Sequence, residues 1–173
     1  MAKQTFKPGN MLYPLPAVMV SCKYPGDDDP ECTNPALRGK PNIITVAWAG
    51  TVCTNPPMLS ISVRPERYSY HIIEKSGEFV VNLTTEDLVR ATDFCGVRSG
   101  RDIDKFKEMH LTEQPSAVVA APGIAESPVN IECKVRQITP LGSHSMILAD
   151  VVNVTVDNAY MNENGKFELN ASG

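Results

Sequence analysis

The residues best suited to hold a flat ring lie around Trp48, the only tryptophan of the chain. Its neighbours are small, because Ala47 precedes it and Ala49 and Gly50 follow it. Small side chains let the backbone approach a planar ligand closely, and backbone amides can then hydrogen-bond the edge of the ring. A lone tryptophan in a strand can also be a core residue, so both interpretations stay open.

A second group of residues, around Arg67 and Ser69, could bind an anion. Ser69 stands at the expected N-cap of a helix over Tyr70–Lys75, and Gly77 can end that helix. A helix N-terminus presents unpaired N–H groups and the positive end of its dipole, which suits a phosphate. The alternative is that Ser69 only caps the helix while Arg67 pairs with a surface carboxylate. A ring system with a phosphate tail would find suitable partners between Trp48 and Ser69.

Other kinds of site lack their signatures in this sequence. The chain has no Gly-rich dinucleotide fingerprint after a predicted strand and no G-x-S-x-G nucleophile elbow. Its three histidines, His71, His110 and His144, do not have the spacing of a zinc site. The run Asp27–Asp29 could be read as a metal site, but nothing fixes the ligands, and a solvated loop tip is the preferred interpretation. We therefore expect no metal site.

Length, charge and cysteine usage narrow the class of protein. At 173 residues the chain predicts one domain, residues 1–173, that can bury a real core. A net charge of −4 and a pI of about 5.4 give no reason to expect nucleic acid or an anionic membrane as a partner. Met1–Asn10 lacks the apolar core of a signal peptide, and no apolar run approaches the ~20 residues of a membrane span.

The five cysteines are odd in number and form no C-x-x-C pair, which favours a reduced, cytoplasmic protein. Cys22 and Cys32 flank a loop and could pair if their Cα atoms came within about 7 Å.

The spacing of apolar residues predicts a mainly β protein. Met58–Arg64 alternates strictly between apolar and polar residues, which indicates a half-buried strand with a cationic outer side. The other extended segments are expected at Ala17–Cys22, in the apolar run Ile43–Gly50, and at Phe79–Leu83, Ile131–Ile138 and Met146–Val156. Without βαβ repetition, such strands favour a closed or nearly closed antiparallel barrel with helices packed outside.

Short helices and loops connect these strands. Besides Tyr70–Lys75, helices are expected from Thr84 or Thr85 to about Phe94, with Gly96 past the end, and over Lys105–His110. The remaining segments are an N-terminal arm at residues 1–10, a surface loop at 24–40, a surface excursion at Gln114–Pro128 and a hairpin turn at Asn164-Gly165.

Three segments, Lys40–Tyr70, Ser76–Leu83 and Cys95–Phe106, together resemble the flavin reductase-like family, and within it flavoredoxin-type proteins. The resemblance runs from about Met11 to about Gly165. It implies an antiparallel FMN-binding split β-barrel of Greek-key type, a homodimer with the flavin at or near the subunit boundary, and redox chemistry on the flavin.

The resemblance also implies cofactor contacts. Asn42 and Thr45 match an N-x-x-T pattern, and Lys105 lies in a segment matching S-G-R-D-x-D-K-F. Lys105 could contact either the pyrimidine end of the flavin or the phosphate. The alternative is a solvated lysine at the start of a helix. The implied set is Asn42, Thr45, Ala47, Trp48, Ala49, Gly50, Thr51, Cys53, Ser62, Arg64, Arg67, Tyr68, Ser69, Ser99 and Lys105.

Two residues are candidates for a direct chemical role. Cys53 matches a position where flavoredoxin-like proteins carry a cysteine near the flavin, although it can also be a small buried hydrophobe. His144 ends Gly142-Ser143-His144, which resembles the Gly-Asp-His motif linked to the nicotinamide side in short-chain flavin reductases. Ser143 replaces the aspartate, which weakens the case for direct NAD(P)H use, and His144 can equally be a turn histidine.

Three functions remain open from the sequence. The first is an FMN flavoprotein that passes electrons from a small-molecule or protein donor to an acceptor. The second is an NAD(P)H:flavin oxidoreductase that uses flavin as a diffusible substrate. The third is a split-barrel module that binds a non-redox ligand. The absorption spectrum of the purified protein would discriminate best among them.

Overall fold

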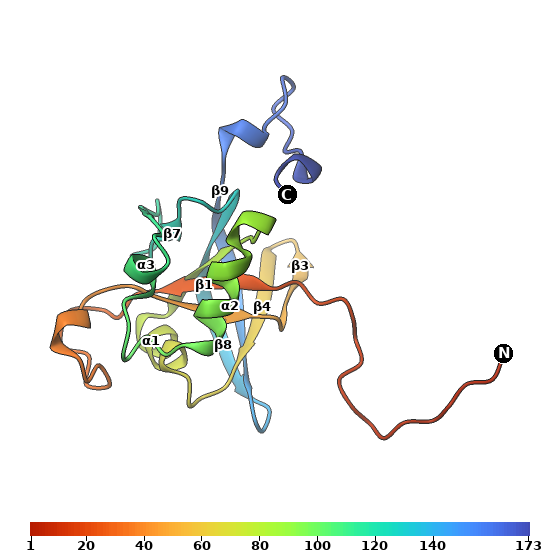
Figure 1. The fold of residues 1–173 in the computed structure, drawn as a ribbon, viewed down its shortest axis with the longest axis horizontal. Coiled ribbons are helices and arrows are strands. Elements are labelled where there is room, and N and C mark those ends of the chain that lie inside the picture. Colours follow the sequence, from red (N-terminus) through yellow and green to blue (C-terminus); the bar gives the residue numbers. More distant parts are fainter.

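The computed structural model describes all 173 residues and is built on one antiparallel sheet of seven strands (Figure 1). The strands run in the order β2-β1-β5-β8-β9-β4-β3, and every neighbouring pair is antiparallel. Their bounds are β1 Val18–Cys22, β2 Asn42–Val46, β3 Ala49–Thr54, β4 Pro57–Val63, β5 Glu78–Asn82, β8 Val129–Pro140 and β9 Ser145–Val156. The predicted antiparallel split barrel is confirmed.

The sheet curls until its two ends meet. The short link from β2 to β3 lies against β4, where the Ser62 N–H donates to the Trp48 carbonyl oxygen over 2.9 Å. The barrel core lies inside this curve, and β4 turns Leu59, Ile61 and Val63 into it, as its alternation predicts. The sheet is thereby closed beside Trp48, which the sequence analysis predicts as a ring contact.

Three helices pack on the barrel: α1 at Tyr68–Ser76, α2 at Val89–Val97 and α3 at Lys105–Glu108. Figure 1 shows α2 in front of the sheet, and a second core of apolar side chains lies between α2, α3 and the strands β1 and β2. Short 3-10 turns occur at Pro35–Leu37, Glu86–Leu88, Asn158–Tyr160 and Leu169–Ala171.

The helix ends are only partly as predicted. Gly77 ends α1 in the left-handed conformation, with φ of 70°, as expected. The predicted helix from Thr84 or Thr85 begins as a 3-10 turn over Glu86–Leu88, and Thr85 is its N-cap residue but makes no capping bond with its side chain. Gly96 lies inside α2 rather than past its end. A Cβ atom there would lie 3.3 Å from the Thr45 Cβ, so the glycine lets α2 approach β2 closely.

Two segments expected at the surface are partly buried. The excursion at Gln114–Pro128 holds the small strands β6, Glu113–Gln114, and β7, Gly123–Ile124, and its Ala121 and Ile124 are fully buried. In the loop 24–40, Asp29 is buried rather than solvated, because Tyr68 and His71 bind its carboxylate. This corrects the prediction of a solvated Asp27–Asp29 tip for its last residue, and no group of side chains suited to a metal ion forms.

The structure also describes the N-terminal residues and the cysteines. Residues 1–10 form an extended arm, which projects from the side opposite the loop 24–40 (Figure 1). Cys22 and Cys32 are both buried and both free, so they do not pair. No helix has the length and apolar character needed to cross a membrane.

The buried carboxylate of Glu132 holds the 115–122 segment against the sheet. It accepts hydrogen bonds from the backbone N–H groups of Ala117, Val118 and Val119 and from the Asn153 side chain, at 2.7 to 3.2 Å. Although burial opposes ionisation, these bonds lower the pKa of Glu132 below its ordinary value. Stabilisation by the ionised group is therefore present above the ordinary carboxyl pKa and lost as the pH falls through the lowered one.

We expect Glu132→Gln to reduce the free energy of unfolding by about 1–3 kcal/mol at neutral pH, because an amide NH₂ then faces backbone donors. Urea unfolding at neutral and at strongly acidic pH measures this effect, and the difference from wild type should shrink in acid. The exposed Glu163→Gln is the control. Equal stability of the two variants at neutral pH would contradict this role of Glu132.

Candidate cofactor site

Three adjoining cavities form one cleft where β2, β4, α1 and α2 meet. The central cavity, here called the ring cleft, has about 150 Å³ and is lined by Thr45, Trp48 and Arg64 among others. It shares Trp48 and His144 with a chamber of about 710 Å³ beside the N-terminal arm. On its other side it shares Ile44, Arg67 and Gly96 with a pocket of about 230 Å³, here called the anion pocket.

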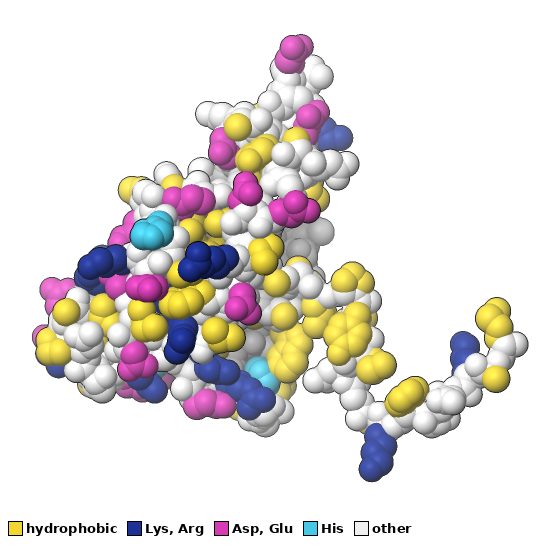
Figure 2. Space-filling view, viewed as in Figure 1, with side chains coloured by type: hydrophobic (Ala, Val, Ile, Leu, Met, Phe, Trp, Pro, Cys, Tyr) yellow, Lys and Arg dark blue, Asp and Glu magenta, His cyan; other side chains and the backbone are white.

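The anion pocket has a buried polar floor and a cationic rim. Asn42, Ser69 and Lys105 form the floor, each at most 4% exposed. The rim carries the guanidinium groups of Arg67, Arg98 and Arg101 and one carboxylate, that of Glu66. Figure 2 shows Lys and Arg side chains gathered on this face, beside a histidine.

The start of α1 differs from the predicted cap. Arg67 is the N-cap residue and makes no side-chain capping bond, while Ser69 is the second residue of the helix. The Ser69 hydroxyl turns inward and accepts a hydrogen bond from Asn42 Nδ2 over 2.8 Å. The backbone N–H groups of Tyr68 and Ser69 have no acceptor within the protein. The predicted helix-end anion site therefore keeps its free donors, although Ser69 reaches it from the floor rather than as a cap.

Asn42 supplies a further unpaired group. Its Oδ1 atom is buried and has no hydrogen-bond partner. A Cβ atom at Gly100 would lie 2.0 Å from this oxygen, so only glycine fits beside it. Because an unpaired buried acceptor is costly, the arrangement is suited to a ligand that donates a hydrogen bond.

Lys105 is neither solvated nor at the rim. Its ammonium group donates to the carbonyl oxygens of Ile43 and Cys95, over 2.6 and 2.9 Å. Two of the three donors of the group are thus used, and the third remains available on the pocket floor. Burial lowers the pKa of Lys105 to about 8.

Trp48 lines the ring cleft. Trp48 is 39% exposed, so it is not a core residue. Its ring meets the His144 ring edge-on, with centroids 4.3 Å apart. Partial burial and the neighbouring Arg64 lower the pKa of His144, and Nδ1 of His144 lies 2.9 Å from the Ser143 hydroxyl. The imidazole is therefore mainly neutral at neutral pH.

Most of the predicted contact residues lie together along this cleft. The ring cleft and the anion pocket bring together Asn42, Thr45, Ala47, Trp48, Ser62, Arg64, Arg67, Tyr68, Ser69, Ser99 and Lys105. The Thr45 hydroxyl already donates to the Thr92 carbonyl oxygen, and Arg64 pairs with Glu66 over 3.4 Å.

The predicted residues of β3 are not part of this cleft. Ala49, Gly50, Thr51 and Cys53 lie on a strand that is exposed along most of its length. Cys53 is the one cysteine that is not buried. Burial raises the pKa of Cys22 and Cys133 to about 12 and that of Cys95 to about 11, so these thiols stay protonated.

Sequence reasoning missed Arg98, Gly100 and Arg101, although all three lie in the segment that resembles the family. Their signal was present, since a cation-rich turn with a glycine directly precedes Lys105. It also missed Asp29, whose partners come from a distant helix.

Comparison with known proteins defines the class. Residues 11–168 match the flavin reductase like domain, and the chain belongs to that family. An uncharacterized protein of Archaeoglobus fulgidus is 30% identical over 131 residues, which span 76% of this chain and 73% of that protein.

Solved structures share the fold. Flavoredoxin of Desulfovibrio vulgaris (Miyazaki F) superposes with a TM-score of 0.85 at 29% identity, over 99% of this chain and 85% of its own. An FMN-binding protein from Thermus thermophilus superposes with a TM-score of 0.75 at 18% identity, over 97% and 85% of the two chains, and shows the fold alone.

The environment of Lys105 leads to a prediction on stability. A lysine whose folded pKa is about 8 and whose ordinary pKa is 10.5 loses its proton earlier in the folded state. Between these values the unfolded chain binds more protons, so this residue makes stability rise with pH. The free energy of unfolding of wild type relative to Lys105→Met should rise by up to about 3 kcal/mol across that window.

Urea unfolding of the ligand-free protein at both ends of the window measures this change. The neighbouring Lys107→Met removes an exposed lysine and serves as the control. A difference between wild type and Lys105→Met that does not vary with pH would contradict a lowered pKa.

Proposed function

We propose that this protein binds FMN and passes electrons from a reductant to an acceptor, as a redox protein of the flavoredoxin kind. The observation that carries the proposal is the unpaired Asn42 Oδ1 on the floor of a cationic pocket. A bare phosphate would leave this acceptor unpaired, whereas a phosphorylated polyol offers both a hydroxyl donor and an anion. The ribityl phosphate of FMN has this combination.

The other contacts follow from that placement. The phosphate would meet the N–H groups of Tyr68 and Ser69, the guanidinium of Arg67 and the free donor of Lys105. The ring would lie in the ring cleft beside Trp48. When bound, FMN supplies the hydride and electron chemistry, and the chain binds and orients it. No side-chain acid or base is needed for that task.

The chamber beside the arm supports a small-molecule partner. It opens next to Trp48 and His144 and has about 710 Å³, which is room for an electron donor or acceptor near the ring. NAD(P)H is one such donor. Tight FMN that co-purifies would favour the electron-transfer role, and NADH-dependent release of reduced flavin would favour a flavin reductase with a diffusible flavin.

The phosphate assignment predicts that the protein prefers FMN to riboflavin. Two or three charge-assisted hydrogen bonds give a preference on the order of a hundredfold or more in Kd. Arg67→Ala should remove most of it and leave riboflavin binding nearly unchanged. Titration followed by Trp48 fluorescence, which bound flavin should quench, measures both ligands.

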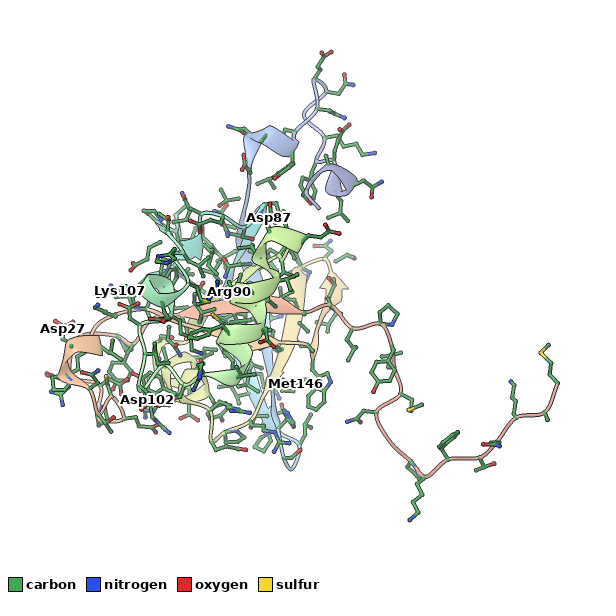
Figure 3. The ribbon with its side chains drawn as sticks, viewed as in Figure 1. Asp27, Asp87, Arg90, Asp102, Lys107 and Met146 are labelled. Atoms are coloured by element: carbon green, nitrogen blue, oxygen red, sulfur yellow. The ribbon has the colours of Figure 1, made fainter.

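The exposed Arg90→Ala, on α2 in Figure 3, is the matched control. Equal Kd values for FMN and riboflavin in the wild type would remove the phosphate from this pocket. A purified protein that is colourless and does not bind added flavin would defeat the function as a whole.

We also propose a homodimer with the flavin near the subunit boundary. Two features of the single chain favour it. β3 is an edge strand whose Val52 is 52% exposed, and residues 1–16 include Phe6, Leu12 and Tyr13, which are at least 70% exposed. Figure 2 shows apolar side chains along the projecting N-terminal segment. A second copy would cover these surfaces and bring the β3 residues of the predicted contact set into an interface.

Light scattering should therefore give twice the mass of one chain, and Val52→Lys on β3 should weaken the dimer without unfolding it. Val118→Lys, which is also at an exposed position, is the control. A monomer with fully bound FMN would contradict the dimer.

A further inference from the structure

The link between β1 and β2, residues 23–41, is longer than a hairpin requires, and it carries a buried carboxylate. The Asp29 side chain is 1% exposed. It accepts hydrogen bonds from the Tyr68 hydroxyl over 2.6 Å and from the Glu31 N–H over 2.9 Å, and it lies 3.0 Å from His71 Nε2. A buried carboxylate is stable only with such partners, so Asp29 anchors the link to α1.

Glu31 extends this anchor toward the anion pocket. Its carboxylate lies 3.3 Å from His71 Nδ1 and forms an ion pair with the Arg101 guanidinium. The guanidinium also lies 5.5 Å from the centroid of the Tyr68 ring. Figure 3 shows Asp27 of this link and Asp102, the residue after Arg101 in the chain, on the same side of the molecule.

Both residues held in this way line the anion pocket. Tyr68 and Arg101 are part of its wall, and Arg101 is 38% exposed at the rim. Burial and the Asp29 hydrogen bond raise the pKa of Tyr68, so its hydroxyl remains a donor to Asp29. Arginine loses side-chain freedom when it binds an anion, and an arginine already fixed by a carboxylate and a ring loses less.

We propose that Glu31 is a positioning residue for ligand binding, which holds the Arg101 guanidinium at the rim of the anion pocket for a phosphate ester. The inference rests on the proposed function, since it concerns the phosphate of FMN. Asp29 serves the same end indirectly, because it fixes the link from which Glu31 projects. Asp29 alone would be enough to anchor residues 23–41 to α1, whereas the Glu31–Arg101 pair also connects these residues to the anion pocket.

The direction in which one substitution changes FMN affinity distinguishes a positioning role of Glu31 from a simple effect of its charge. Glu31→Gln removes a negative charge near the pocket and keeps the shape of the side chain. Acting through its charge alone, the change would tighten FMN binding. Acting through Arg101, it should weaken FMN binding roughly three- to tenfold and leave riboflavin unchanged, since the pair is partly exposed.

The experiment measures Kd for FMN and riboflavin in wild type, Glu31→Gln, Arg101→Gln and the double variant, with the exposed Asp28→Asn as the matched control. We expect Glu31→Gln to lower the FMN preference, Asp28→Asn to keep it, and the double variant to match Arg101→Gln. Melting temperatures identify any variant that fails to fold, and Glu31→Gln is the deciding one because its side chain is 40% exposed.

An unchanged or increased FMN preference in Glu31→Gln would overturn the inference and leave the proposed function standing. An additional loss in the double variant beyond that of Arg101→Gln would also overturn it, because Glu31 would then act by another route. Equal binding of FMN and riboflavin by the wild type would overturn the phosphate assignment and this inference together.

Discussion

The buried ammonium group of Lys105 joins the parts of the structure on which the candidate site depends. It comes from α3 and bonds to a carbonyl of β2 and a carbonyl of α2, so one side chain ties three elements together. Burial of a charge is unfavourable, which the lowered pKa of Lys105 reflects. The buried ammonium group lies on the floor of the anion pocket, where a bound phosphate would favour the charged form of Lys105.

The floor of the pocket also holds a neutral polar group whose burial is unfavourable. The Nδ2 atom of Asn42 is used by Ser69, and the Oδ1 atom is left without a partner beside Gly100. Elsewhere in the interior, buried polar groups are paired, as in the Glu132 carboxylate with its four donors. The unpaired acceptor is therefore an exception at one place, and exceptions of this kind are characteristic of binding sites.

The strands and the place of Trp48 beside the cleft could be predicted because their signals are local. The alternation from Met58 to Arg64 sets the face that each residue of β4 presents, and Gly77 marks the end of α1 by its own backbone preference. The start of α1 could not be predicted in the same way. Ser69 is a good N-cap by type, but Asn42 lies far away in sequence and draws its hydroxyl inward. Asp29 was misread for the same reason, since Tyr68 and His71 reach it only in the folded chain.

The two ends of the cleft have opposite character, and this difference bears on function. The anion pocket has a floor of buried residues and a rim of cations, which under the proposed function would hold the cofactor by its phosphate. The ring cleft leaves Trp48 partly exposed and opens into the chamber beside the arm. A cofactor that only stabilised the fold would have no need of an open ring end. A cofactor that exchanges electrons needs its ring within reach of a partner while its tail stays bound, and both features of the cleft therefore support the proposed electron-transfer role.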